Sequence, residues 1–289
     1  MGMQINTNVA ALNAYRNLSN TQNDLSNSLE KLSSGLRINR AADDAAGLAI
    51  SEGLRSQVNG LNVAARNAQD GISVIQTAEG ALTEVHSILQ RVRDLAVQAG
   101  NDSNNTESRA AIQTEVTQLT DELVRIADAT NFNGIDLLKG GDLTFQVGAD
   151  GGAASQITVS LADMQDALSS ITALTYAAGA PTTHTPDATN YLFDSAANAA
   201  LAITAIDTAI TKVSSARAEL GASQNRFEST INSLNVSSEN LAAAESRIRD
   251  TDMASEMVKY TAANILSQAG TAMLAQANQA NQGVLQLLR

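Results

Sequence analysis

The sequence contains no cysteine and no tryptophan, only two prolines, and 3% aromatic residues. Without cysteine, neither disulfides nor thiolate metal ligands can hold the chain together. Because aromatic side chains are so scarce, any core must be filled by Ala, Leu, Ile and Val, and small side chains allow helices to approach one another closely. The composition therefore favours bundles of packed helices.

Long apolar runs and an excess of basic charge are also missing. Polar residues interrupt every apolar stretch, so nothing approaches the roughly 20 apolar residues of a membrane span. Residues 1–20 have neither a basic start nor an apolar run, so they do not form a cleavable secretory signal. The formal net charge of -12 repels phosphate at long range. We therefore expect neither nucleic-acid binding nor membrane insertion.

A repeat of apolar side chains every seven residues dominates the second half of the chain, from Ile203 to Ile248. One series within it is apolar at every position: Ile206, Val213, Leu220, Phe227, Leu234, Leu241 and Ile248. The companion series admits Arg217 and Glu245. The pattern predicts one helix, roughly 70 Å long at about 1.5 Å per residue, with one strong apolar seam and one partly polar seam.

Three further apolar stripes with alternating spacings of three and four predict helices to cover that seam. They occupy residues 15–36, 61–89 and 112–126. Helices from both ends of the chain are thus expected to pack side by side. The predicted fold class is mainly α, a long antiparallel helical bundle or coiled coil.

The period changes from about 3.5 residues to two within residues 143–161. Two alternating stretches are separated there by a glycine-rich turn at residues 148–152, which predicts a small β-hairpin. Both prolines fall in residues 177–190, which have no apolar period. We expect an exposed loop in that segment.

No group of residues has the spacing of a catalytic or metal site. Asp43 and Asp44 have no histidine or third carboxylate near them in sequence, so we interpret the pair as a helix cap. His86 and His184 are the only histidines, and neither lies in an HExxH or triad setting. We therefore predict no enzyme activity, no cofactor and no metal.

Several segments resemble bacterial flagellin. They are QINTNVAALNA (residues 4–14), LSSGLRIN (32–39), AADDAAGLAI (41–50), QRVRDLAVQ (90–98), NFNG (131–134), SRIRDTDMA (246–254) and VLQLLR (284–289). The resemblance extends over residues 3–161 and 203–289. It implies a structural subunit that self-assembles into the extracellular flagellar filament used for motility and is exported by the flagellar type III route. A hook-filament junction protein, which shares the terminal helices, is the alternative.

The resemblance also implies a division of the chain in the polymer. Residues 1–43 with 250–289 would form an inner terminal coiled-coil layer. Residues 44–175 with 196–249 would form an outer helical rod carrying the β-hairpin, and residues 176–195 a short exposed variable loop. A zinc protease in the variable region is disfavoured because His184 stands alone there, and the short loop leaves little surface for an adhesin.

Partners and interaction residues follow from the same resemblance. The implied partners are other copies of the chain, a flagellar export chaperone, a cap protein and the animal Toll-like receptor for flagellin. The receptor surface would consist of Arg91, Leu95 and Glu115, of which the first two, four residues apart, share a helix face. Asp94 departs from the glutamate common in this motif.

Filament assembly is assigned to apolar residues near the two chain ends. Such stripes are too extended to satisfy each other in one subunit, and an open helical array of neighbours would bury them. The predicted assembly residues are Leu18, Leu25, Leu29, Leu32, Val284, Leu285, Leu287 and Leu288.

Overall fold

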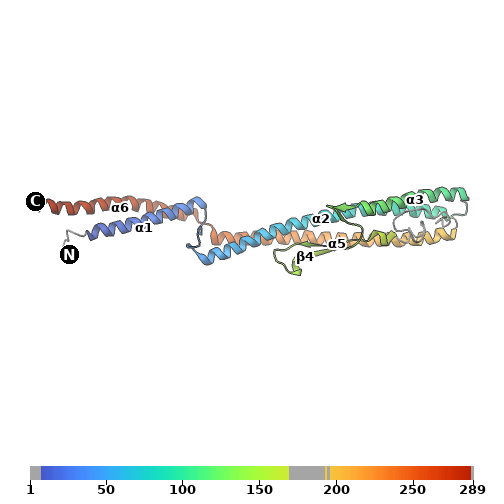
Figure 1. Ribbon diagram of the computed structural model, residues 1–289, viewed down its shortest axis with the longest axis horizontal. Helices are drawn as coiled ribbons and strands as arrows, with labels where there is room; N and C mark the ends of the chain where they lie inside the picture. Colours follow the sequence, from blue (N-terminus) through green and yellow to red (C-terminus); the bar gives the residue numbers. More distant parts are fainter. Residues whose placement is uncertain (1–7, 169–192, 194–195, 288–289) are drawn as a thin grey trace. The chain divides into compact units, whose positions relative to one another are not determined.

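The structure, a computed structural model, describes residues 8–168, 193 and 196–287, from residue 280 onward by backbone alone. Long helices dominate it (Figure 1). They are α1 (Val9–Ser34), α2 (Ala45–Ala99), α3 (Thr106–Ala129), α5 (Ala196–Arg249) and α6 (Met253–Leu287). The strands are β1 (Asn131–Phe132), β2 (Ile135–Asp136), β3 (Asp142–Gln146) and β4 (Gln156–Ser160), with a 3-10 turn, η1 (Ala153–Ser155), before β4. The predicted mainly α class with a small β-hairpin is confirmed.

The chain forms two compact units. The first combines Met1–Val58 with Ser238–Arg289, and the second is Asn59–Ser237. Within the described residues, no helix has the length and apolarity that crossing a membrane requires. The predicted division into inner layer, outer rod and variable loop concerns the polymer and stays a prediction.

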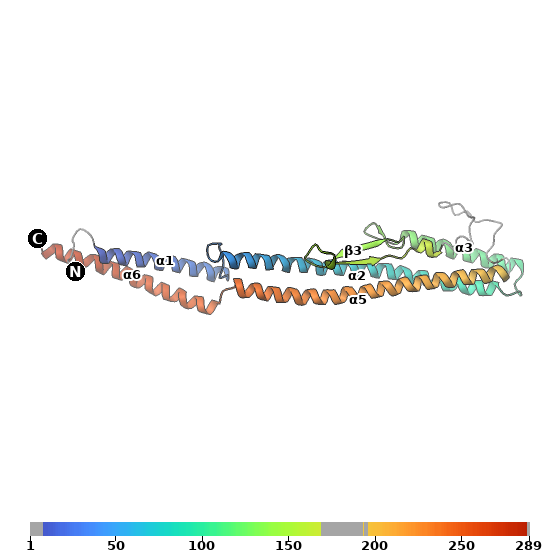
Figure 2. The same cartoon turned by 90° about the horizontal axis from the view of Figure 1, so that it is seen from below.

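In the first unit, α1 and α6 lie side by side and run antiparallel (Figures 1 and 2). Asn8 Nδ2 donates to the Ala277 carbonyl at 2.9 Å near one end of the pair. The Ser28 hydroxyl donates to the Glu256 carboxylate at 2.7 Å near the other. The stripe in residues 15–36 was expected to cover the seam of residues 203–248, but it contacts α6 instead.

In the second unit, α2, α3 and α5 share one core, and this core covers the seam of α5 from Ile203 to Ile231. Every third or fourth residue of each helix points into it because apolar side chains recur at that spacing. The three helices contribute to it, among other side chains at most 2% exposed, Ile75, Leu82, Leu89, Val116, Leu123, Ile206, Val213, Leu220 and Phe227. The seven-residue series of α5 is therefore confirmed as a buried seam from Ile206 to Leu234, whereas Leu241 and Ile248 are only half-buried.

The predicted β-hairpin is confirmed as β3 and β4, which pair antiparallel with Phe145 opposite Ile157. The hairpin lies along α2 and α5 (Figure 2). Phe145 meets Phe227 edge to face, with ring centroids 5.5 Å apart. A Cβ at Gly71 would lie 2.9 Å from the Phe227 ring, so glycine leaves the space that this ring fills. Asn67 Nδ2 also donates to the Gln146 carbonyl at 3.0 Å.

The structure extends the sequence predictions at the start of two helices and adds one small hairpin. The Asp44 carboxylate accepts from the Gly47 N–H at 2.9 Å, which caps α2 as expected and starts it well before residue 61. α5 begins seven residues before Ile203. Asn133 and Gly134 have φ values of 51° and 80° and join β1 to β2 in a tight turn that was not predicted. The loop at residues 177–190, with His184, lies outside the described residues.

Candidate assembly surface

Small residues of α6 face α1. The seven-spaced positions Ala263, Gly270 and Ala277 lie on this side of the helix. Ala263 is 8% exposed, and a Cβ at Gly270 would lie 3.2 Å from Leu18 Cδ1. Small side chains at a contact shorten the distance between two helix axes. The pair is therefore close, but α6 contributes little apolar area to it.

Tyr260 and Leu274 of α6 are half-buried, but six other large apolar side chains of this helix are exposed. Each is between 47% and 70% exposed: Met253, Met257, Val258, Ile265, Leu266 and Met273. They do not form one stripe, because Val258 and Ile265 share one side of the helix while Leu266 and Met273 share another. Large apolar side chains that are exposed on more than one side of a helix indicate a surface that partners bind. One neighbouring helix cannot cover these sides.

α1 shows the same tendency in part. Its exposed large apolar residues, each 53% to 61% exposed, are Val9, Leu12, Tyr15 and Leu29. The structure thus divides the predicted assembly residues of this helix: Leu29 is exposed, whereas Leu18, Leu25 and Leu32 are half-buried. Leu18 lies against Gly270 of α6, and the other two follow it at intervals of seven residues on the same side. The side chains of Val284, Leu285, Leu287 and Leu288 lie outside the described part of the chain.

The two breaks in the helices of the first unit are paired with each other. The Thr251 N–H donates to the Gly35 carbonyl at 2.9 Å, and the Arg37 N–H donates to the Arg249 carbonyl at 2.6 Å. Gly35 can end α1 because its φ of 74° lies in the left-handed region, which glycine adopts without steric penalty. These backbone bonds fix the register in which α1 and α6 begin to pack.

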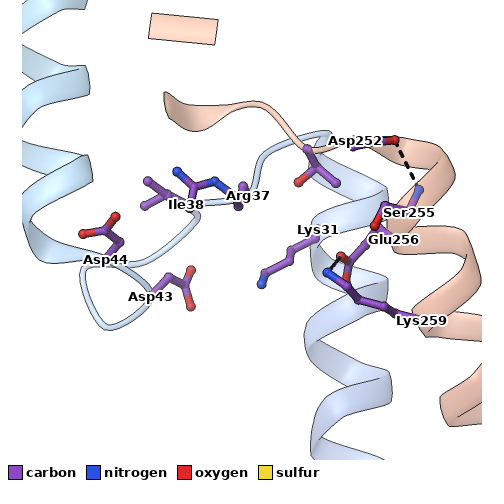
Figure 3. A pocket seen from close by; sticks show the side chains of 10 residues that line it. Lys31, Arg37, Ile38, Asp43, Asp44, Asp252, Ser255, Glu256 and Lys259 are labelled. Atoms are coloured by element: carbon purple, nitrogen blue, oxygen red, sulfur yellow. Dashed lines mark hydrogen bonds and ion pairs between the residues drawn. The ribbon is translucent and has the colours of Figure 1, made fainter. Parts of the chain in front are cut away.

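A hollow of about 440 Å³ lies beside this paired segment (Figure 3). Groups of both charges line it, and Lys31 reaches between Asp43 and Glu256. The Asp43 carboxylate accepts from the N–H groups of Arg40 and Asn39 at 2.9 and 3.0 Å, which lowers its pKa. In the described residues, no group of three or more His, Asp or Glu side chains could hold a metal ion. The hydrogen bonds of this site instead stabilise the loop after α1.

Glu256 is the only charged residue buried within the described part of the chain, at 5% exposed. Burial alone would raise its pKa, but the Ser28 hydroxyl and the Lys259 ammonium, 3.0 Å away, bring the pKa below its ordinary value. A carboxyl with a lowered pKa in the fold stabilises it fully above the pKa of the unfolded chain. That stabilisation is lost as the pH falls through the folded pKa.

We therefore expect Glu256→Gln to reduce the acid sensitivity of the α1–α6 pair. The variant should lose helicity more easily at neutral pH, because it keeps an acceptor for Ser28 but loses the charge that Lys259 binds. The two proteins should converge once the pH has fallen through the lowered pKa of the native carboxylate, because that carboxylate is then protonated as well. Far-UV circular dichroism against pH measures this, with the exposed Glu239→Gln as the matched control. If the helicity of Glu256→Gln depends on pH in the same way as that of Glu239→Gln, Glu256 does not cause the acid sensitivity of the α1–α6 pair.

The three residues of the predicted receptor surface are not equally accessible. Arg91 binds Glu115 through two nitrogens at 2.6 and 3.0 Å, and the two side chains are 56% and 44% exposed. Leu95 is only 3% exposed and belongs to the core of the second unit. The structure brings the charged pair together on the surface of α2 and α3, and Leu95 supports that surface from below.

The predicted assembly residues include none of α6 before position 284, although residues 250–289 are predicted to belong to the inner layer. The signal was present, because Met253, Met257, Ile265, Leu266 and Met273 all stand in the final helical stretch. They lie on several sides of the helix and therefore define no heptad stripe. Only the burial of their neighbours shows which sides are left open.

The second unit has a packed helical core, and the first is a helix pair with exposed large apolar side chains. This combination is typical of one class of protein, a structural subunit that is completed by copies of itself. Two protein-family models match the chain. The model of the bacterial flagellin N-terminal helical region matches residues 5–142, and the model of the bacterial flagellin C-terminal helical region matches residues 203–288. The chain belongs to the bacterial flagellin family.

Full-length relatives agree. The chain is 53% identical to a flagellin of Bacillus subtilis (strain 168), across 99% of this chain and 100% of that protein. It is 49% identical to the flagellar filament 33 kDa core protein of Treponema phagedenis, with the same coverage of both chains. The solved structure of a putative flagellar hook-associated protein from Vibrio parahaemolyticus is similar in fold, with a TM-score of 0.58 over 72% of this chain and all of that one.

The Vibrio parahaemolyticus protein is only 15% identical to this chain in sequence, so its structure shows a similarity of fold and nothing more. Identities near 50% over full-length flagellins favour the filament subunit over the hook-filament junction protein. The chain is therefore a structural subunit of the flagellar filament, which lies outside the cell.

Proposed function

We propose that copies of the chain polymerise through the outward faces of α1 and α6. One observation carries this: α6 turns small side chains toward α1 and leaves six of its large apolar side chains exposed. Burying one such side chain contributes about 1.5–3 kcal/mol, so six per subunit, repeated along a lattice, strongly favour the polymer. An open helical array can surround α6 with neighbours on every side, which a closed dimer cannot do.

Electron microscopy of the purified protein tests the proposal. A filament subunit should form long tubes of uniform diameter. The same sample should show a concentration below which only free subunits remain. A protein that stays monomeric, or forms only small closed oligomers, across the soluble concentration range would contradict polymerisation through these faces.

The remaining predicted partners fit the same surface. Before export, the exposed side chains of α6 would associate prematurely, so an export chaperone that covers them keeps the subunit free, and a cap protein then guides it onto the growing end. Val284, Leu285, Leu287 and Leu288, the apolar residues nearest the chain end, are proposed to take part in the same assembly. A role in structure alone, without enzyme activity, is consistent with a helix surface devoted to packing.

The exposed pair of Arg91 and Glu115 is the proposed contact for the animal Toll-like receptor for flagellin, with Leu95 holding α2 in place beneath it. Charge reversal by Arg91→Glu should break the pair and place two like charges together. Activation of receptor-bearing cells by free subunits should then require roughly tenfold more protein, equivalent to about 1.4 kcal/mol.

A matched control for this prediction is Arg125→Glu, which breaks the exposed pair of Arg125 with Glu122 on α3. Both variants should keep the helicity of the unmodified protein. If Arg91→Glu and the control activate the receptor equally well, Arg91 is not part of the receptor surface.

A further inference from the structure

The methionines of the chain are divided between two very different environments. Met164 is 1% exposed in the core of the second unit. Met253, Met257 and Met273 are 47%, 51% and 66% exposed, and all three lie on α6. Met1 and Met3 lie outside the described residues. The exposed thioethers are thus gathered on one helix, and that helix carries the proposed assembly surface.

The three exposed methionines reach more than one side of α6. Met253 and Met257 are one helical turn apart and share a side. Met273 lies 16 residues beyond Met257, next to the exposed Leu266 on another side of the helix. Neighbouring subunits that surround α6 would therefore bury methionine sulfur at separate contacts.

Thioether sulfur is the site of a reversible oxidation. A peroxide transfers one oxygen atom to the sulfur, which loses two electrons and becomes a sulfoxide, while the peroxide is reduced to water. The product is polar and accepts hydrogen bonds, unlike the flexible apolar side chain it replaces. Enclosing it in an apolar contact without a donor is unfavourable. Reduction by methionine sulfoxide reductase restores the thioether.

We infer that Met253, Met257 and Met273 form an oxidation-sensitive element that controls whether a free subunit can join the polymer. Peroxide modifies these side chains in the free subunit, and the resulting sulfoxides oppose the packing of α6 against neighbouring copies. Subunits already in the polymer are protected, because their α6 helices are covered. The inference rests on the proposed assembly through α6.

The test begins with free subunits treated with hydrogen peroxide and analysed by peptide mass spectrometry. Met253, Met257 and Met273 should gain one oxygen each, while Met164 should stay unmodified. The concentration needed for polymerisation should rise at least about tenfold, equivalent to about 1.4 kcal/mol. The two methionine sulfoxide reductases, one for each sulfoxide epimer, should together reverse the rise when a thiol reductant is supplied. Treated subunits that polymerise at the normal concentration would overturn the inference.

A triple variant with Met253→Leu, Met257→Leu and Met273→Leu is the matched control. Leucine has a similar volume and polarity, so the untreated variant should polymerise as the unmodified protein does. It keeps Met1, Met3 and Met164, so any effect of oxidation at those positions would persist in it. The variant should polymerise normally after peroxide treatment. An equal loss in the variant and the unmodified protein would place the sensitivity elsewhere and overturn the inference.

Peroxide treatment of preformed filaments completes the test. The three residues of α6 should be oxidised much more slowly there than in free subunits. Equal oxidation rates in both states would overturn the protection that the inference requires. If untreated protein forms no filaments at all, the proposed function itself fails, which distinguishes that failure from a failure of the methionine inference.

Discussion

A subunit carrying Ile265→Glu and Leu266→Glu is expected to form no filaments at ~100 times the concentration at which the unmodified subunit polymerises, a difference of about 2.7 kcal/mol. The two side chains are 61% and 60% exposed and point to different sides of α6. Each replacement loses about 1.5–3 kcal/mol of apolar burial in the polymer. It also places a carboxylate in an apolar contact without a partner, which is unfavourable in itself.

The fold of the single subunit should not change, because both side chains are more than half exposed in it. Circular dichroism should show unaltered helicity, and sedimentation should show no polymer. Leu201→Glu on α5 is the matched control, since Leu201 is 62% exposed but belongs to the second unit. Filament growth by the double variant at the normal concentration would mean that α6 is not the polymerising surface.

Phe227→Ala is expected to lower the free energy of unfolding of the second unit by about 3–5 kcal/mol, the range for deleting a buried ring. Phe227 is fully buried, and its ring fills the space left by Gly71 and meets Phe145 of the hairpin. Removing it leaves a cavity at the point where α2, α5 and β3 join. The thermal midpoint should fall by on the order of 10 °C.

Val63→Ala is the control for this change, because Val63 of α2 is 45% exposed in the same unit and its truncation should alter stability by less than about 0.5 kcal/mol. Denaturant unfolding followed by circular dichroism measures both variants. If Phe227→Ala unfolds at the same midpoint as Val63→Ala, the Phe227 ring does not hold α2, α5 and β3 together.

Periodicity predicted the second unit well because its helices bury one side only. The seven-spaced residues of α5 from Ile206 to Phe227 are buried as a seam. The alternation around Phe145 gives the β3–β4 hairpin, whose strands are long enough to show it. The β1–β2 hairpin was missed, because strands of two residues carry no period and only the conformation of Asn133 and Gly134 marks the turn.

The apolar period alone did not identify the partner of each stripe, and the grouping of residues 1–43 with 250–289 came from the resemblance to flagellin. Residues 15–36 have a stripe that fits several helices equally well, and the paired breaks at Gly35 and Thr251 direct α1 to α6. Likewise, the spacing of Arg91 and Leu95 shows that they share a face but not how deeply each is buried. Burial depends on the helix packed against them, which the local pattern does not specify.

The most direct measurement of the central claim uses the absence of native cysteine. Ile265→Cys introduces the only thiol of the chain, so a maleimide reports on the exposure of this position alone. Ala154→Cys, at an exposed position of the η1 turn, provides the control thiol. We expect rapid labelling of both variants as free subunits, and in filaments rapid labelling of residue 154 with little or none of residue 265. Equal labelling of residue 265 in filaments and in free subunits would contradict burial of α6 between copies.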